Sequence, residues 1–187
     1  MNIALFPQML VSSTKGWPEL EKARPSIARV FLLLVLPLSL LPPIMLHFAG
    51  GHYGDVLFAG MPARQWSLIA VIFFLAEMIT FAAMGWLIKE ISDTYKVEIS
   101  LHDAYLLAAI SPIPLWLSSL ALLVPSLAFG VGVSFVGLCV SCAIIYHGIY
   151  AFCHMNEEIA AAGFTFAVIS AGLLAWVMLM VLVVLPV

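Results

Sequence analysis

Five long runs of apolar residues dominate this sequence and restrict its possible folds more than any other feature. The runs occupy residues 27–48, 66–88, 104–124, 126–150 and 163–185. Each holds about the 20 residues that a helix needs to cross the hydrocarbon core of a bilayer. The runs are too long for barrel strands and lack the alternation of lipid-facing and lumen-facing residues. The sequence therefore predicts an all-α, polytopic integral membrane protein, a bundle of five transmembrane helices.

Composition excludes the soluble classes of protein. Apolar residues make up 64% of the 187 residues and charged residues only 9%, against about 45–50% and about 25% in soluble domains. The net charge is −3 and there is no basic block, so we expect no nucleic-acid partner. The sequence also lacks a phosphate-binding loop, a nucleophile elbow and a metalloprotease motif. We therefore expect neither an enzyme nor a cofactor.

The positions of the basic residues predict the orientation of the bundle. On one side of the membrane lie Lys15, Lys22, Arg24, Arg29, Lys89 and Lys96. Only Arg64 falls on the other side. Because basic loops stay in the cytoplasm, we expect a cytoplasmic N-terminus, a C-terminus outside and a multi-pass location in a cell membrane of the bacterial inner-membrane type.

The chain divides into two parts. Residues 1–26 form a cytoplasmic N-terminal segment, and residues 27–187 form the five-span membrane domain. The spacing of Ile3, Phe6, Met9 and Leu10 fits an interfacial amphipathic helix, with a disordered tail as the open alternative. We expect no cleaved signal peptide, because the first apolar run is too long for one.

The segments that flank the first span have two notable features. Arg24 and Arg29 stand just before the first span, where they can meet anionic lipid headgroups. Between the first two spans, residues 49–65 are rich in glycine and include Pro62. This composition predicts an irregular outer loop.

Glu77 is the most unusual residue, because it falls in the middle of the second span. A carboxyl at this depth is costly, and no Lys or Arg lies at matching depth in another span. We therefore expect Glu77 to be protonated and to donate a hydrogen bond. Its expected partners are the hydroxyls of Ser39 and Ser111 and the backbone carbonyls that Pro112 and Pro114 release in the third span.

This intramembrane polar site has two interpretations. Transporters bind ions and substrates between broken helices, so Glu77 is a candidate coupling residue. The simpler interpretation is an interhelical hydrogen bond that holds the bundle together. We favour the hydrogen bond, because a transport path usually contains several ionisable groups at depth and this chain has one.

Rows of small residues follow the last two spans. They comprise Gly130, Ser134, Gly137, Ser141 and Gly148 in the fourth span and Gly163, Ala167, Ala171 and Ala175 in the fifth. Such rows let helices approach closely. We expect them to pack the spans of one bundle.

A metal site is the least supported possibility. Cys139 and Cys142 share a helical face, but His147 is five residues further on and points elsewhere. Small thiols also serve as ordinary apolar packing groups. We therefore expect no metal, with these three residues as the weak candidates.

The order of features resembles a known family. Residues 12–20 read Ser-Ser-Thr-Lys-Gly-Trp-Pro-Glu-Leu before the first span. The third span contains Ala-Ala-Ile-Ser-Pro-Ile-Pro-Leu at residues 108–115, and the fourth ends in Tyr-His-Gly-Ile-Tyr at residues 146–150. Together these resemble the Yip (Ypt-interacting protein) domain family in its compact prokaryotic form. The resemblance implies a five-helix membrane domain with a cytoplasmic N-terminus.

The resemblance also carries functional expectations. Eukaryotic members are associated with Rab-type small GTPases and vesicle traffic, whereas prokaryotic members generally lack an assigned activity. The long N-terminal extension of the eukaryotic proteins does not precede the first span here, so we do not expect GTPase binding. Many relatives have a basic residue after the fourth span where this chain has Asn156, Glu157 and Glu158, so we expect no headgroup contact there.

The sequence thus favours a non-enzymatic Yip-type membrane protein with a role in membrane organisation or a trafficking-like process. Its expected partners are the lipid bilayer, other membrane proteins or a second copy of itself. Two alternatives stay open. One is a small proton-coupled transporter or channel component that uses Glu77, and the other is an accessory subunit of a larger membrane complex.

Overall fold

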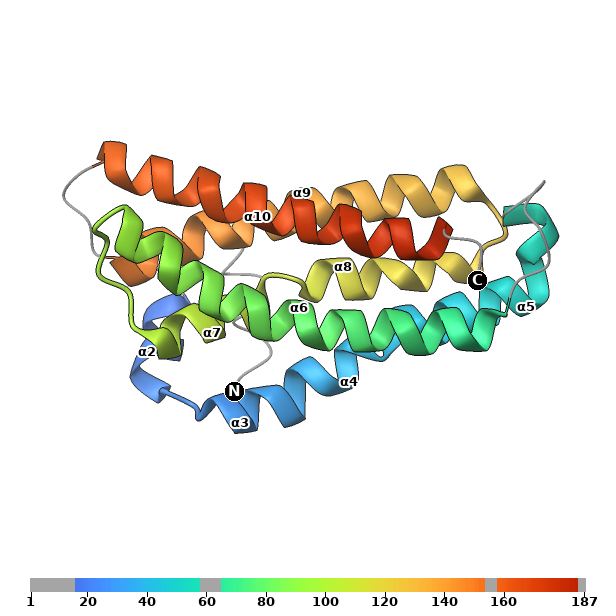
Figure 1. Ribbon diagram of the computed structural model, residues 1–187, viewed down its shortest axis with the longest axis horizontal. Helices are drawn as coiled ribbons and strands as arrows, with labels where there is room; N and C mark the ends of the chain where they lie inside the picture. Colours follow the sequence, from blue (N-terminus) through green and yellow to red (C-terminus); the bar gives the residue numbers. More distant parts are fainter. Residues whose placement is uncertain (1–15, 58–64, 154–157, 185–187) are drawn as a thin grey trace.

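The computed structural model describes residues 16–57, 65–153 and 158–184, and within these ranges the chain is helical without strands (Figure 1). In chain order the elements are α2 (Trp17–Ala23), α3 (Ile27–Val30), η2 (Phe31–Val35), α4 (Leu36–Ser39), α5 (Leu41–Leu57), α6 (Trp66–Thr94), α7 (Leu101–Ile110), α8 (Ile113–Ser118), η3 (Ser119–Leu123), α9 (Leu127–Cys153) and α10 (Glu158–Val184).

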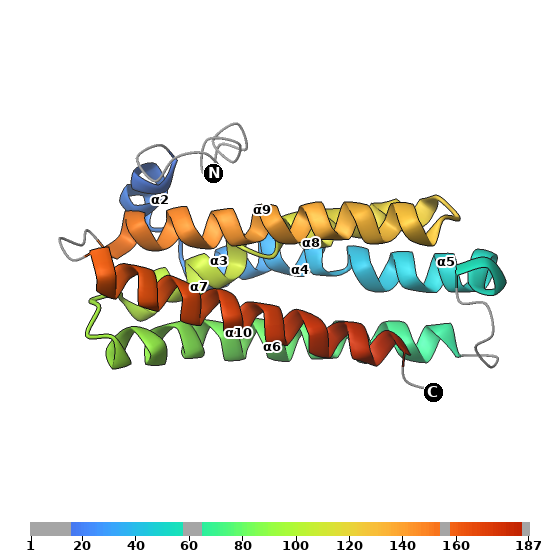
Figure 2. The same ribbon diagram turned by 90° about the horizontal axis from the view of Figure 1, so that it is seen from above.

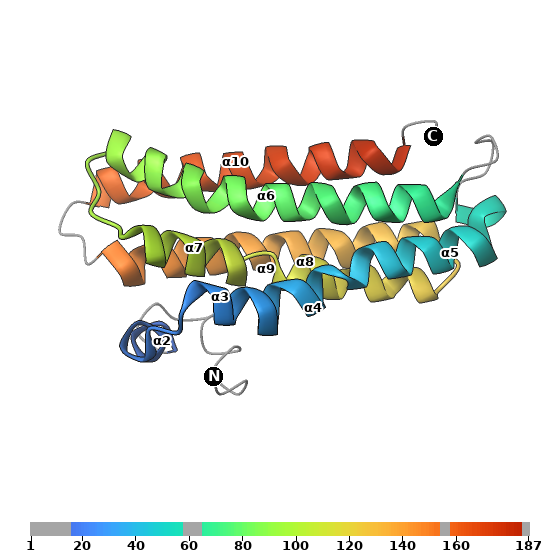
Figure 3. The same ribbon diagram turned by 60° about the horizontal axis from the view of Figure 1, so that its bottom comes forward.

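These elements combine into five helical segments long and apolar enough to cross a membrane. Their bounds are Ile27–Val56, Trp66–Thr94, Leu101–Leu123, Leu127–Phe152 and Ala162–Val183. They lie side by side along the long axis of the molecule (Figures 1 and 3). Large apolar side chains cover the outer surface, including Ile79 and Phe166 at 70% and 71% exposure. Such a surface suits lipid, and the predicted all-helical, five-span fold is confirmed.

Proline interrupts the first span. Pro37 has no N–H group, and just before it the helix widens into the π-helix η2, where the Leu36 N–H donates to the Phe31 carbonyl. Widened turns of this kind absorb a break in the regular hydrogen-bond ladder. Pro42 then falls in the first turn of α5, where a missing N–H costs nothing.

The third span breaks near its middle. The ladder of α7 ends with the Ser111 N–H donating to the Leu107 carbonyl at 3.0 Å. Pro112 cannot continue the ladder, and α8 restarts with the Trp116 N–H donating to the Pro112 carbonyl at 3.0 Å. Figure 3 shows the non-helical connection between α7 and α8.

The predicted irregular loop is wrong over residues 49–57, which continue α5, with one kink at Tyr53. Gly50 explains the difference, because the indole of Trp66 packs on its bare backbone. A Cβ atom at Gly50 would lie 2.0 Å from that ring. The glycine therefore serves close packing between α5 and α6 and does not form a turn. The rest of the predicted loop, residues 58–64, and the predicted amphipathic segment around Phe6 lie outside the described residues.

The densest packing lies in the half of the bundle next to α2. Trp17 on α2 is 0% exposed, and its ring meets Phe152 edge-on with centroids 5.3 Å apart. Gly148 on α9 leaves room for this indole, since a Cβ there would lie 2.7 Å from it. Figure 2 shows α2 against the end of α9. His102 Nε2, 2.9 Å from the Pro25 carbonyl, also ties the start of α7 to the connection between α2 and α3.

We predict that Gly85→Ala destabilises the protein by about 1–3 kcal/mol, as overpacking does. A Cβ at Gly85 on α6 would lie 2.3 Å from the Tyr105 ring of α7, whose hydroxyl donates to the Ala82 carbonyl at 3.2 Å. The measurement is thermal unfolding in detergent. Gly132→Ala on α9 is the control, because nothing lies within 4 Å of that position. Equal melting temperatures for the two variants would contradict the close α6–α7 contact.

Candidate functional site

The buried carboxyl of Glu77 is bound to the indole of Trp116. Glu77 lies on α6 with 6% of its surface exposed. The Trp116 Nε1–H donates to Glu77 Oε1 at 2.9 Å, between residues 39 positions apart in the chain. In apolar surroundings each of these groups would be costly to leave unpaired. The pair therefore links the second span to the third.

The break in the third span places Trp116 at this point. The residue follows one turn after Pro112, near the start of α8, and is 5% exposed. Because α8 begins anew after the break, its phase is independent of the phase of α7. The proline motif therefore acts by directing an indole toward α6, in addition to releasing backbone carbonyls.

The second carboxyl oxygen has a different environment. Glu77 Oε2 is buried and has no hydrogen-bond partner among the described residues. The same holds for the hydroxyl oxygen of Ser141 on α9. Buried polar atoms without partners are uncommon in folded proteins, so these two mark the most unusual polar environment in the described part of the bundle.

A cavity of about 420 Å³ adjoins both groups. Its walls come from α5, α6, α7, α8, η3, α9 and α10, and most of its lining is apolar. Two further hydroxyls in the wall are engaged within their own helix: Ser118 Oγ donates to the Leu115 carbonyl at 2.7 Å, and Ser119 Oγ donates to the Trp116 carbonyl at 2.6 Å. Among the buried side-chain oxygen and nitrogen atoms that the structure describes, Glu77 Oε2 and Ser141 Oγ are the two without a hydrogen-bond partner, and both residues line this cavity.

The other predicted members of the polar site separate into two groups. Ser111 and Pro112 line the cavity together with Glu77. Ser39 is buried elsewhere, and its hydroxyl donates to the Leu36 carbonyl of its own helix at 3.2 Å. The Pro114 carbonyl instead faces α9, 3.0 Å from where a Cβ of Gly137 would stand. None of these groups is the observed partner of Glu77.

The actual partner, Trp116, was missed by the sequence analysis. One signal was present, because a tryptophan inside a transmembrane helix needs an acceptor for its N–H when it is buried. Glu77 was the one carboxyl in the middle of a span. Matching an isolated donor with an isolated acceptor would have suggested the pair.

The small residues of α9 differ in what they contact. Gly137 lets α8 approach closely, as its distance to Pro114 shows. Ser141 is 4% exposed, and Gly130, Ser134 and Ser141 all line the cavity. Nothing lies within 4 Å of a Cβ placed at Gly130. The row therefore combines a close helix contact at Gly137 with a wall of the cavity.

The small residues of α10 make one close contact and otherwise lie on a mostly exposed helix. A Cβ at Gly163 would lie 2.7 Å from the Tyr95 ring, which follows α6. Ala167 and Ala171 are half-buried. The α10 span is more exposed than any other span, so much of this helix faces outward.

The cysteines of α9 show no ligand cluster. Cys139 and Cys142 both carry free thiols. Cys139 is exposed and Cys142 is half-buried. The ring of His147 packs edge-on against Tyr146 with centroids 5.3 Å apart. Among the described residues, no group of three or more His, Cys, Asp or Glu side chains is placed to hold a metal ion.

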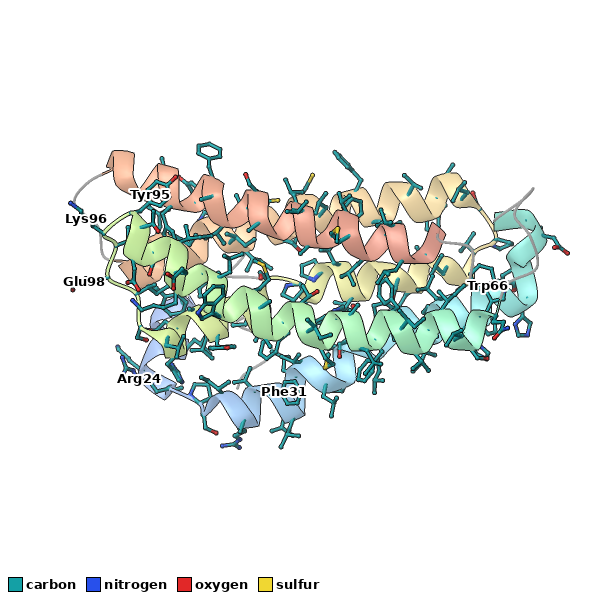
Figure 4. The ribbon with its side chains drawn as sticks, viewed as in Figure 1. Arg24, Phe31, Trp66, Tyr95, Lys96 and Glu98 are labelled. Atoms are coloured by element: carbon teal, nitrogen blue, oxygen red, sulfur yellow. The ribbon has the colours of Figure 1, made fainter. Side chains whose placement is uncertain are left out.

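The predicted headgroup residues are exposed near one end of the bundle. Arg24 ends α2 in a left-handed conformation with φ of 34°, and Arg29 stands in α3. Figure 4 shows Arg24 at the same end as Lys96 and Glu98, with Trp66 at the opposite end. Charged side chains thus gather at the end where α2 lies.

Comparison with protein-family models identifies the family of this chain. The family model described as "Yip1 domain" matches residues 8–179. The chain belongs to the Yip1 domain family. The match covers nearly the whole membrane bundle and confirms the resemblance drawn from the sequence motifs. No curated protein and no solved structure matches the chain.

Family membership also gives a meaning to the motif residues that the structure describes. Trp17, from the segment before the first span, is the buried anchor of α2. Pro112, from the third span, precedes the turn that presents Trp116. The chain is a multi-pass membrane protein of the Yip1 family, with α2 packed against α9 near one end and a cavity toward the other end.

We predict that Trp116→Phe lowers the free energy of unfolding by about 0.5–2 kcal/mol, the range of interhelical hydrogen bonds in membranes, because it leaves a buried carboxyl oxygen without its donor. Thermal unfolding in detergent measures the change. Trp176→Phe is the matched control: Trp176 lines the same cavity from α10, and its indole makes no hydrogen bond with the residues that the structure describes.

A double variant separates the hydrogen bond from general packing. Glu77→Leu removes the acceptor, so adding Trp116→Phe to it is expected to cost less than Trp116→Phe costs alone. Strictly additive losses would show that the indole and the carboxyl do not stabilise each other.

Proposed function

We propose that this protein is a non-enzymatic component of the membrane that acts by binding lipid or other membrane proteins within the bilayer. The observation that carries the proposal is the apolar cavity beside Glu77, which adjoins seven of the helical elements and is lined by a single carboxyl among the described residues. A cavity lined in this way accommodates hydrocarbon. The Yip1 family is not known for an enzymatic activity, and this fits a binding role.

The outer surface supports the same role. Large apolar side chains project from several spans, among them Leu33, Phe135 and Leu174, each more than 60% exposed. This surface meets lipid tails or the apolar face of a membrane partner at equal cost. Together with the cavity it favours lateral interaction within the bilayer over catalysis at a polar site.

Proton-coupled transport is less well supported. A transport path needs water or a series of ionisable groups that reaches the site. Here the cavity wall is mainly apolar, and its one carboxyl is held by Trp116. We infer that the Glu77–Trp116 hydrogen bond holds the bundle together and does not couple proton movement.

We place the protein in the bacterial inner membrane with the α2 end in the cytoplasm. Lys22, Arg24 and Lys96 are exposed at or near that end, and basic residues favour the cytoplasmic side. Arg24 and Arg29 would then lie against anionic headgroups, where each basic residue contributes about 1 kcal/mol of attraction.

Cysteine labelling tests this orientation. In a chain whose native cysteines are replaced, we expect a membrane-impermeant maleimide to label Gly51→Cys but not Glu98→Cys in intact cells. Both positions are exposed, and they lie at opposite ends of the bundle. Permeabilised cells provide the control, because both variants should then react. The reverse pattern in intact cells would place the α2 end outside.

Extraction of the protein with its native lipid tests the binding role. We expect particles extracted with a copolymer to retain a membrane-protein partner, a second copy or a lipid class enriched over the bulk membrane. Mass spectrometry of the particles identifies each of these. A lone chain surrounded by bulk lipid in repeated preparations would contradict the proposal.

Reconstituted vesicles test the transport alternative. We expect the purified protein to give no proton-dependent flux above that of empty vesicles, and Glu77→Gln to leave this unchanged. A flux that Glu77→Gln abolishes, with the fold retained, would establish transport in place of the binding role.

A further inference from the structure

The cavity contains two buried oxygen atoms that no described residue satisfies. Glu77 Oε2 projects from α6 and Ser141 Oγ from α9, and both residues line the cavity. Glu77 is 6% exposed and Ser141 is 4% exposed. A polar atom left unpaired in the interior carries its full desolvation cost. Two such atoms on one cavity favour a ligand that offers them hydrogen bonds.

The hydrogen bond to Trp116 shows which kind of group Glu77 offers. Among the residues that the structure describes, neither Lys nor Arg lines the cavity, so an ionised carboxylate would be buried without a counter-charge from them. In the neutral acid, the oxygen that accepts the Trp116 N–H is the carbonyl oxygen, Oε1. The hydroxyl is then at Oε2. Both unpartnered groups are therefore O–H donors, and what they need is an acceptor oxygen.

The rest of the cavity wall indicates the size of the ligand and the chemistry of its remaining part. From Glu77 toward the Trp66 end of α6, the cavity is lined by Phe73, and Leu46, Leu122 and Val183 add further apolar wall. The volume of about 420 Å³ falls within the range of roughly 300–1,000 Å³ typical of small-molecule sites. The described wall has no cation to neutralise a phosphate, so the site does not suit a phospholipid headgroup.

We propose that the cavity binds one neutral amphiphile with a hydrocarbon chain and a single uncharged oxygen function, either a hydroxyl or a carbonyl. The oxygen accepts a hydrogen bond from the Glu77 carboxyl, and Ser141 offers a second. The chain lies along the apolar wall toward the Trp66 end of α6. This site rests on the binding role proposed above and specifies the class of lipid.

Binding of hexadecanol tests the site. Purified protein in phospholipid nanodiscs is titrated with brominated hexadecanol, which quenches the fluorescence of Trp116 and Trp176 in the cavity wall. Lipid-facing Trp86, 57% exposed, gives a background that does not saturate. We expect saturable quenching that unlabelled hexadecanol reverses and hexadecane, which lacks the oxygen, does not. Equal competition by the alkane would overturn the proposal.

Serine variants identify the donors. We expect Ser141→Ala to weaken hexadecanol binding about five- to tenfold, the loss of one hydrogen bond. Ser118→Ala is the matched control, because Ser118 lines the same cavity but its hydroxyl is engaged with the Leu115 carbonyl. It should bind as the unchanged chain does. Equal affinity of the two variants would contradict the role of Ser141.

Glu77→Leu should weaken binding similarly, and Glu77→Gln should retain most of it, since the amide N–H₂ is also a donor. If Glu77→Leu does not fold, the Gln variant together with Ser141→Ala carries the test. Loss of saturable hexadecanol binding, with native particles still enriched in a partner or another lipid, would overturn this site and leave the proposed binding role standing.

Discussion

A carboxyl group in the middle of a lipid-embedded bundle must find its hydrogen bonds within the protein, because the hydrocarbon around it offers none. In this Yip1-family protein one indole, Trp116, donates to Glu77 Oε1 at 2.9 Å, whereas Oε2 has no partner among the described residues. The contact joins the second and third spans where the third is broken. The position of α8 and the shape of the cavity both depend on this pair.

The two halves of the bundle are packed differently. At the α2 end, Trp17 and Phe152 belong to a continuous core that also includes the buried α7. Toward the other end the buried apolar cluster is small, formed by Leu46, Phe73 and Val183, and the cavity lies there. A densely packed half near the charged surface and a half that holds the cavity fit the proposed binding role inside the bilayer. Interhelical hydrogen bonds in membranes contribute only about 0.6 kcal/mol on average, so the dense core supplies most of the stability.

Sequence patterns predicted the five spans and the importance of Glu77, since both depend on local composition. The partner of Glu77 was not predicted. A buried tryptophan in the third span was a signal for it, but the position of that indole depends on the phase of α8 after the Pro112 break, which is a tertiary property. The helix over residues 49–57 was missed for a related reason, because the packing of Trp66 on Gly50 outweighs the turn preference of glycine. The unpartnered Ser141 hydroxyl likewise becomes visible only when neighbouring helices are in place, since mid-helix serines usually bond their own backbone.

The exchange rate of the Trp116 indole proton tests most directly whether the hydrogen bond between Trp116 and Glu77 is formed and shielded from water. In nanodiscs transferred to heavy water, nuclear magnetic resonance should find this N–H resonance protected for far longer than that of an indole in contact with water. Its chemical shift should move in Glu77→Gln, which changes the acceptor. Rapid exchange would mean that water reaches the indole through the cavity. A chemical shift that does not change in Glu77→Gln would mean that the indole and the carboxyl are not hydrogen-bonded.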